Sequence, residues 1–230
     1  MPPFAQDEQL EVAPAAELKP LVSVVTPFYN TADYLEECIQ SVLNQTYPEF
    51  EYVLLDNCSK DGSLEIAARY AKQDPRIRLL TNSTFLTQVQ NYNAALGLIS
   101  PQSRYTKIVQ ADDRIYPRCL EEMVAVAESD SSVGIVSSFC LRGSKVGMDG
   151  FPFSESVVCC RQLCRYQLLE GDRFFRSPTT VMYRSAVVRD RAPFYKEGRY
   201  FEDTEACFEV LQTWNFGFVQ QVLKIGRAHV

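Results

Sequence analysis

The chain has 230 residues, a formal net charge of −6, and 46% hydrophobic, 12% aromatic and 23% charged residues. This length is typical of one domain, and the composition is apolar enough to fill a core, which excludes a disordered, collagen-like or coiled-coil protein. The acidic balance provides no general field to hold a phosphate backbone, so we expect no nucleic-acid partner.

The N-terminal segment 1–20 is rich in Pro, Ala and Glu and lacks the basic start and apolar stretch of a signal peptide, so we expect a flexible leader. No apolar run reaches the roughly 18–20 residues that span a bilayer. We therefore expect a cytoplasmic protein whose cysteines are mostly buried thiols. Cys159, Cys160 and Cys164 form the one cluster to consider as a zinc site, but they lack a second ligand pair at finger-like spacing, which favours packing.

The first elements alternate between strands and helices. Leu21–Thr26 is a β-branched run that stops at Pro27, which is typical of a buried parallel strand. Apolar residues recur at three- and four-residue steps over 35–43 and predict a helix. Tyr52–Leu55 predicts a second strand and closes one βαβ unit.

The same alternation continues as far as Phe139. Strands that alternate with amphipathic helices predict a mostly parallel sheet covered on both faces, in a three-layer α/β/α fold. Loops at the carboxyl ends of such strands form the ligand crevice. The predicted helices cover 63–73, 87–98 and 117–128, and the predicted strands cover 76–80, 105–109 and 133–138.

Beyond Phe139 the alternation weakens. The segment 143–153 is rich in glycine and is either a flexible lid or a plain connection. Further on, we expect helices near 161–169 and 203–213 and strands at 180–183 and 216–223.

Three acidic residues directly follow predicted strands. Asp56 follows 52–55, and the pair Asp112 and Asp113 follows 105–109, so these side chains are expected in the crevice. Two adjacent carboxylates repel each other unless a cation lies between them. A hard divalent ion completed by substrate phosphates satisfies such a pair. The alternative is an Asp-Asp turn that caps the next helix.

Four motifs around these residues come in a fixed order: SVVTPFYN at 23–30, SVLNQTYP at 41–48, LDNCSKDGS at 55–63 and QADD at 110–113. With the later Glu202-Asp203 pair, they resemble the family 2 glycosyltransferases, which are inverting, nucleotide-sugar-dependent enzymes of the Rossmann-like GT-A fold. The resemblance covers residues 21–223. It implies sugar transfer from a nucleoside-diphosphate sugar to an acceptor hydroxyl, in the synthesis of surface polysaccharide or lipid-linked glycan.

The resemblance implies a nucleotide site near the first two strands. Pro27 and Tyr29 would line the pocket of the base, and Tyr29 would offer an aromatic face for stacking. Asp56 would face the nucleoside, and Asn57 stands where the family commonly has a second Asp. Because an ionised Asp only accepts hydrogen bonds whereas Asn also donates, the base stays undetermined.

The resemblance also implies a metal and a base. Asp112 would reach the ribose, and Asp113 would hold the Mg²⁺ or Mn²⁺ that bridges the diphosphate. Asp203 matches the Glu-Asp motif of a late helix and is the candidate base for the acceptor hydroxyl. The helix dipole at that position favours an ionised carboxylate. Glu202 is the fallback, and an ordinary helix cap is the structural alternative.

The sequence departs from the family at two further places. Tyr92 stands where many relatives carry a phosphate-facing Arg, and Arg114 and Arg176 are the substitutes that the sequence offers. Gln220 stands where some relatives place a metal-binding His, which weakens the case for a third protein ligand. The segment 177–180 resembles the family segment beside the acceptor and the diphosphate, and a turn into a strand explains it equally well.

The implied partners are a nucleoside-diphosphate sugar and a glycan or lipid-linked acceptor, and peripheral association with the inner face of a membrane stays open. Two other functions stay open as well, because fold alone does not determine function. One is a nucleotide-sugar-binding or nucleotidyl-transferring protein, which would release pyrophosphate. The other is an inactive relative that serves as an interaction module.

The last residues, 225–230, read like one translated frame of a sequencing adapter. We therefore expect the authentic chain to end near Lys224, with a catalytic domain over 21–224 and a non-native tail after it. His229 is given no catalytic role for this reason.

Overall fold

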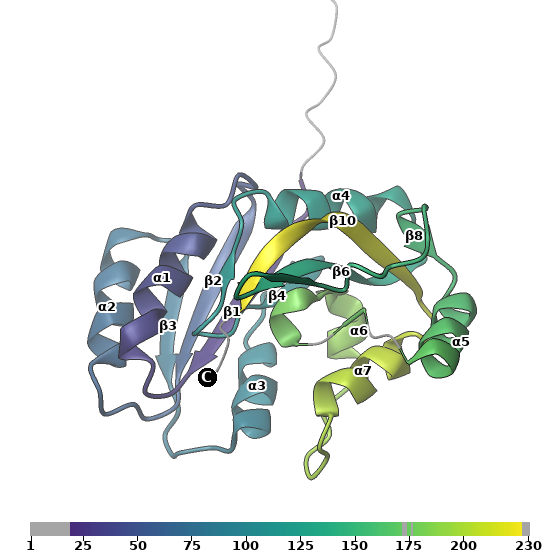
Figure 1. Cartoon of the computed structure of the whole chain (residues 1–230). Coiled ribbons are helices and arrows are strands. Elements are labelled where there is room, and N and C mark those ends of the chain that lie inside the picture. The colour runs from purple at the N-terminus through teal and green to yellow at the C-terminus, as the bar shows by residue number, and fades with distance from the viewer. Residues whose placement is uncertain (1–18, 172–173, 176, 227–230) are drawn as a thin grey trace, which may run out of the picture.

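The computed structural model describes residues 19–171, 174–175 and 177–226. Segment 1–18 of the expected leader, Arg176 and His229 lie outside these residues. The described strands form one sheet with helices on both faces (Figure 1). The strands are β1 (Val22–Phe28), β2 (Phe50–Asp56), β3 (Ile77–Thr81), β4 (Tyr105–Ile108), β5 (Arg114–Ile115), β6 (Val133–Arg142), β7 (Lys145–Gly147), β8 (Val157–Val158), β9 (Met182–Arg184) and β10 (Asn215–Gly226).

Apolar periodicity explains where the longer helices form. The first helix buries Leu35, Cys38, Ile39 and Val42 on one stripe, as the spacing predicts. Its polar face is left to solvent. The helices are α1 (Ala32–Leu43), α2 (Ser63–Gln73), α3 (Gln88–Leu96), α4 (Cys119–Ser129), α5 (Cys160–Glu170), the 3₁₀ turn η1 (Pro178–Thr180), α6 (Ser185–Arg189) and α7 (Glu202–Val210).

The sheet is mixed but mostly parallel, in the order β3-β2-β1-β4-β9-β6-β10-β5. β3, β2, β1 and β4 are parallel neighbours, and β6 and β10 form a second parallel pair. β9 lies between the two groups and is antiparallel to both β4 and β6. The predicted α/β class is therefore confirmed, and β1, β2, β4, β6 and β10 all end at the same edge of the sheet.

Two hydrophobic clusters lie on opposite faces of the sheet. Val24 of β1 belongs to the cluster under α1, α2 and α4, whereas its neighbour Val25 belongs to the cluster under α3, α5, α6 and α7. Successive residues of a strand point to opposite faces, so a parallel strand covered on both sides is apolar throughout. This arrangement makes the three layers of the fold (Figure 1).

The eight cysteines are all free thiols. Cys38, Cys119, Cys140 and Cys207 are buried, as the packing interpretation predicts, whereas Cys159 is exposed. In the described part of the chain, no cluster of three or more His, Cys, Asp or Glu side chains has a geometry that holds a metal. The cysteines of α5 therefore give no support to a zinc site.

The second half of the chain contains short elements that periodicity does not predict. Residues 143–153 include β7, which forms a hairpin with β6, and Phe151, whose ring stacks on that of Phe218 with centroids 3.9 Å apart. This packing supports a connection rather than a lid. Strand β9 begins two residues later than expected, because 178–180 forms η1, and β10 extends through Ile225 and Gly226 of the expected tail.

We predict that Gly134→Ala destabilises the pairing of β6 with β10. A Cβ at position 134 would lie 2.5 Å from both Cβ and Cγ of Trp214, and backbone-attached atoms cannot move apart without shifting a strand. Such overpacking costs about 1–3 kcal/mol in the free energy of unfolding, measurable by urea denaturation. Ser131→Ala, at an exposed position in the preceding turn, is the control. An unchanged midpoint for the Gly134 variant would contradict the packing described here.

Candidate active site

Two adjoining cavities open at the edge where the parallel strands end. The aromatic cavity, of about 430 Å³, is lined by residues including Pro27, Tyr29 and Phe85. The acidic cavity, of about 230 Å³, is lined by the carboxylates Asp112, Asp113, Glu202 and Asp203 among others. Four residues line both cavities: Gln88, Tyr92, Gln110 and Asp112. Because the cavities share these residues, one ligand can occupy both.

Two exposed rings rim the aromatic cavity. The ring centroids of Tyr29 and Phe85 are 4.8 Å apart with an interplanar angle of 62°, and the two residues are 42% and 60% exposed. Large aromatic surfaces left in solvent favour a planar ligand that covers them. Phe85 lies in a loop without a recognisable motif, so sequence reasoning did not find it.

The polar residues at the end of β2 support this cavity. Asn57 lines it, but the side-chain amide donates to the carbonyl of Leu86 at 2.8 Å and accepts from the Leu86 N–H at 2.9 Å. Asp56 is buried, accepts from the N–H of Ser59 at 3.0 Å, and is absent from the described walls of both cavities. Asp56 therefore stabilises the turn after β2, and its direct contact with a nucleoside stays a prediction.

A chain of hydrogen bonds crosses the shared floor. The Tyr92 hydroxyl accepts from the side-chain amides of Gln88 at 3.1 Å and Gln110 at 3.0 Å. The Gln110 N–H donates to the hydroxyl of Thr179 at 3.0 Å. The buried Lys107 ammonium donates to the Thr179 carbonyl at 2.6 Å, and burial lowers its pKa. These bonds attach η1 to the end of β4.

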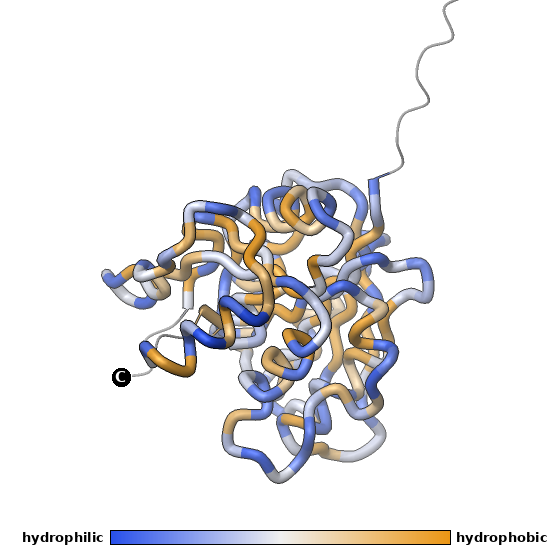
Figure 2. Tube along the Cα trace, turned by 90° about the vertical axis from the view of Figure 1, so that its right-hand side faces the viewer, coloured by the Kyte–Doolittle hydropathy of each residue, from blue (hydrophilic) through white to orange (hydrophobic). Residues whose placement is uncertain are grey.

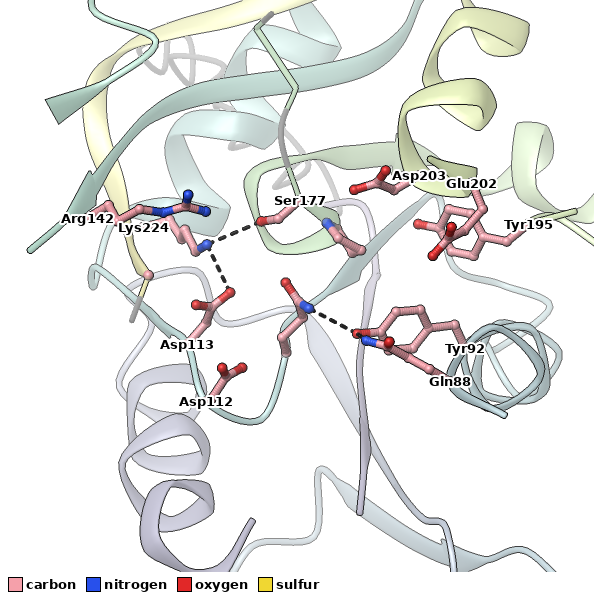
Figure 3. Close-up of a pocket in the computed structure, with 13 residues that line it drawn as sticks. Gln88, Tyr92, Asp112, Asp113, Arg142, Ser177, Tyr195, Glu202, Asp203 and Lys224 are labelled. Carbon is pink, nitrogen blue, oxygen red and sulfur yellow. Dashed lines mark hydrogen bonds and ion pairs between the residues drawn. The ribbon is translucent and has the colours of Figure 1, made fainter. Parts of the chain in front are cut away.

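The acidic cavity brings together carboxylates from distant parts of the sequence. Asp112 and Asp113 come from the turn after β4, and Glu202 and Asp203 come from the first turn of α7. Figure 3 shows the two pairs on different walls of one cavity. Ser177 and Pro178 of the segment before β9 also line it.

An ammonium group lies beside Asp113. Lys224 Nζ is 2.9 Å from Asp113 Oδ2, and the two side chains are 5% and 6% exposed. The same ammonium donates to the hydroxyl of Ser177 at 3.2 Å (Figure 3). Burying a carboxylate is costly unless a partner neutralises it. Lys224 is that partner, and sequence reasoning had noted it only as the last residue before the expected tail.

The donor set at Asp113 fits a divalent cation that a ligand completes. Mg²⁺ usually keeps water or substrate phosphate in its shell and takes one or two protein carboxylates, which Asp113 and Asp112 can supply. A cation at Asp113 would share that carboxylate with Lys224. The amide of Gln220 donates to the Phe153 carbonyl at 3.0 Å and lies outside the described walls of this cavity.

Asp203 lies at the start of α7, where its Oδ1 accepts from the N–H of Thr204 at 2.6 Å. Burial raises the pKa of Asp203 even though the hydrogen bonds from Thr204 lower it, and the charge of Glu202 raises it further. This corrects the expectation that the helix dipole would dominate. A carboxylate whose pKa lies closer to neutrality is a better general base.

Of the two arginines proposed from the sequence as substitute cations, the structure describes only Arg114. Arg114 forms an ion pair with Glu37 at 3.2 Å and lines a separate, small cavity beside Asp112. Arg176 lies outside the described residues. Instead, Arg142 at the end of β6 lines the acidic cavity (Figure 3), a position that sequence reasoning did not find.

Comparisons with known proteins agree with this geometry. The family model described as "Glycosyl transferase family 2" matches residues 23–191. The chain is 29% identical over 192 residues to the glycosyltransferase GlyG of Streptococcus pneumoniae, which covers 80% of this chain and 62% of GlyG. It is also 30% identical to TuaG of Bacillus subtilis, a glycosyltransferase provisionally named for teichuronic acid biosynthesis. That alignment spans 173 residues and covers 74% of this chain and 58% of TuaG. The chain thus spans about three fifths of the length of these relatives.

Two solved structures have the same fold. S. aureus TarS (residues 1–349) in complex with UDP-GlcNAc aligns with a TM-score of 0.73 at 22% identity, over 91% of this chain and 59% of that one. The mannosyltransferase PcManGT from Pyrobaculum calidifontis, in complex with GDP-Man and Mn²⁺, aligns with a TM-score of 0.67 at 18% identity, over 97% of this chain and 61% of that one. At this identity, the likeness establishes the GT-A fold alone.

None of the described helices combines the length and the apolar character that crossing a membrane requires. Figure 2 shows hydrophobic and hydrophilic residues interleaved along the helices rather than gathered into one long apolar segment.

The raised pKa of Asp203 predicts a pH-dependent effect of Asp203→Asn. In the unfolded chain this carboxyl ionises near its ordinary pKa of 3.8, and in the folded protein it ionises at a higher pH. The folded state then binds more protons across this window, so wild-type stability falls as the pH rises through it. The Asn variant avoids this loss and should melt at a higher temperature than the wild type near neutral pH.

Calorimetric melting temperatures of the two proteins across acidic and neutral pH test this prediction. The advantage of the variant should shrink as the pH falls and should vanish below pH 3.8, where the carboxyl becomes protonated in both the folded and the unfolded state. Asp33→Asn, at an exposed position in the first turn of α1, is the control and should show no such gain. An advantage of the Asp203 variant that does not change with pH would contradict the burial argument.

Proposed function

Since this chain belongs to glycosyl transferase family 2, we propose that it is an inverting glycosyltransferase that moves a sugar from a nucleoside-diphosphate sugar to an acceptor hydroxyl. One observation carries the proposal: Asp113 and Asp203 line the same cavity. That cavity adjoins an aromatic one of a size that suits a nucleoside. A donor that spans both would present its sugar carbon between the two carboxylates.

In the proposed complex, the nucleoside occupies the aromatic cavity. The base stacks on Tyr29 or Phe85, which are exposed and close together, and Pro27 forms part of the wall. Asp112 lines both cavities and is suited to accept a hydrogen bond from the ribose. Asn57 holds the Leu86 backbone and so positions the Phe85 loop, in addition to lining the cavity.

The proposed cofactor is Mg²⁺ or Mn²⁺, held by Asp113 together with the phosphates of the donor. When bound, such an ion stabilises the negative charge that develops on the leaving nucleoside diphosphate. The Mn²⁺ in the structurally similar mannosyltransferase supports this proposal. Because Lys224 neutralises Asp113, we expect tight metal binding only when the donor is present.

The proposed base is Asp203. In an inverting displacement, the acceptor attacks from the face opposite to the leaving group, so its proton must be taken by a group across the cavity from the diphosphate. Asp203 lies on the α7 wall, whereas Asp113 lies on the β4 wall (Figure 3). One carboxylate is sufficient, because no covalent intermediate forms. Glu202, in the same turn, is suited to hold the acceptor.

The names of the relatives support a place in cell-surface polysaccharide synthesis. TuaG is provisionally named for teichuronic acid biosynthesis, and the similar TarS structure contains UDP-GlcNAc. We therefore propose that uridine diphosphate sugars are the first donors to test, and that the acceptor is a glycan or a lipid-linked glycan. A lipid-linked acceptor would bring the protein to the inner face of a membrane without a spanning helix.

Asp203→Asn should abolish transfer while leaving donor affinity unchanged. Loss of a positioned general base typically costs about 10²–10⁴-fold in rate, whereas the Asn side chain keeps the shape and the acceptor oxygen for Thr204. Donors are first chosen from a panel of nucleotide sugars by thermal stabilisation with Mn²⁺. Release of nucleoside diphosphate and calorimetric donor binding are then measured for both proteins.

Glu205→Gln, at another carboxylate of the first turn of α7 that lies outside the described walls of the acidic cavity, is the matched control and should retain most of the turnover. Full activity of the Asp203 variant would remove it as the base. Release of pyrophosphate in place of nucleoside diphosphate would favour a nucleotidyl transferase. Failure of the wild type to bind or hydrolyse any donor would favour an interaction module.

Asp113→Asn should weaken donor binding in a metal-dependent way. A neutral amide binds a hard cation less well than a carboxylate does, so donor affinity in Mn²⁺ should fall by about tenfold or more, as expected for the loss of one charge-assisted contact. In EDTA the two proteins should differ little. A calorimetric titration in Mn²⁺ that shows equal donor affinity would argue against Asp113 as the metal ligand.

A further inference from the structure

We propose that Arg142 binds the diphosphate of the donor. It would thereby replace the phosphate-facing arginine that the resemblance implies on α3, where this chain has Tyr92. This inference rests on the proposed function, because it concerns the same donor. It adds a residue that no sequence motif indicates, and it assigns that residue a defined ligand group, the pyrophosphate oxygens.

A rigid hairpin delivers Arg142 to the cavity. Arg142 is the last residue of β6, and it pairs with Lys145 across the β6–β7 hairpin and with Gly226 of β10. Gly143 has a φ of +59°, which glycine adopts readily at the first central position of a two-residue hairpin turn. Because β7 and β10 hold the backbone of Arg142 on both sides, little backbone conformational entropy is lost when its side chain binds a ligand.

Charge in the acidic cavity favours an anion at this position. Its described cations are Arg142 and Lys224, and the Lys224 ammonium is engaged by Asp113 and Ser177. The guanidinium of Arg142 makes no hydrogen bond or ion pair with any residue of the described chain. Arg142 is therefore the cation that a bound anion meets without breaking an existing contact.

The other basic residues that the structure describes near the site, Lys107 and Arg114, are already engaged. Lys107 donates to the backbone carbonyls of Thr179 and Val181, and Arg114 pairs with Glu37. At Tyr92, where the resemblance implies a phosphate-facing arginine in many relatives, the hydroxyl is held by two glutamine amides. An incoming diphosphate thus finds a neutral floor at α3 and a free guanidinium at β6.

The route of the donor leads to the same place. A nucleoside in the aromatic cavity passes Asp112, which both cavities share, and its phosphates then enter the acidic cavity beside Asp113. Figure 3 shows Arg142 next to Lys224 on the wall above Asp113. A planar guanidinium can donate two parallel hydrogen bonds to phosphate oxygens, which a single ammonium cannot do.

The test measures, by calorimetry in Mn²⁺, how Arg142→Gln and the wild type bind two series of ligands. One series is uridine, UMP and UDP, and the other is guanosine, GMP and GDP. The affinity for the diphosphate that binds should fall by about tenfold or more, as expected for hydrogen bonds to a charged group. The affinity for the nucleoside should stay the same. Arg142→Lys should lie between the two proteins, because it keeps the charge but not the paired donors.

Lys145→Gln is the matched control, because it removes the same charge from the same hairpin at an exposed position outside the described walls of the acidic cavity. It should bind the diphosphate like the wild type. Equal diphosphate affinity of the Arg142→Gln variant, or an equal loss for the nucleoside, would overturn the role of Arg142 while leaving the proposed function intact. If the wild type binds neither UDP nor GDP, the proposed function itself fails, and this inference fails with it.

Discussion

The site depends on the direction in which β9 runs. β9 is antiparallel to both β4 and β6, so β4 and β6 must run in the same direction as each other. Their carboxyl ends, with those of β1, β2 and β10, therefore meet at one edge. For the same reason, the segment before β9 begins at that edge, which is how η1 comes to lie beside the turn after β4. One antiparallel strand thus gathers residues from both halves of the chain.

The edge of the sheet at which these strands end gathers several negatively charged side chains in one cavity. Four carboxylates line the acidic cavity, and burial penalises each ionised one unless a partner neutralises it. The protein uses two solutions. Lys224 provides a cation next to Asp113. Asp203 accepts hydrogen bonds from Thr204 but forms no ion pair with any residue that the structure describes, and burial raises its pKa. The two environments give the carboxylates different properties, one suited to a cation and the other to a proton.

Sequence reasoning predicted the parts of this fold that repeat and missed those that sheet closure creates. Helix α2 begins and ends at the predicted residues, because periodic burial is a local property of the sequence. Strands β5 and β7 are too short for any periodicity, and Arg142 reaches the cavity only because β6 pairs with β9 and β10. Asp56 was correctly expected at a strand end, yet its side chain turns into the protein to hold a backbone turn, which composition alone does not reveal.

Two of the three residues at which the sequence departs from the pattern that the resemblance implies, Asn57 and Tyr92, have one physical consequence in common. Asn57 and Tyr92 are neutral, and each is held by neutral partners: Asn57 by Leu86 and Asn82, and Tyr92 by two glutamine amides. Amides do not ionise, and burial raises the pKa of the Tyr92 hydroxyl further above neutrality, so these hydrogen bonds do not change protonation state near neutral pH. The floor under the donor is therefore a fixed surface, and the charged residues that respond to metal, proton and phosphate lie on the walls above it.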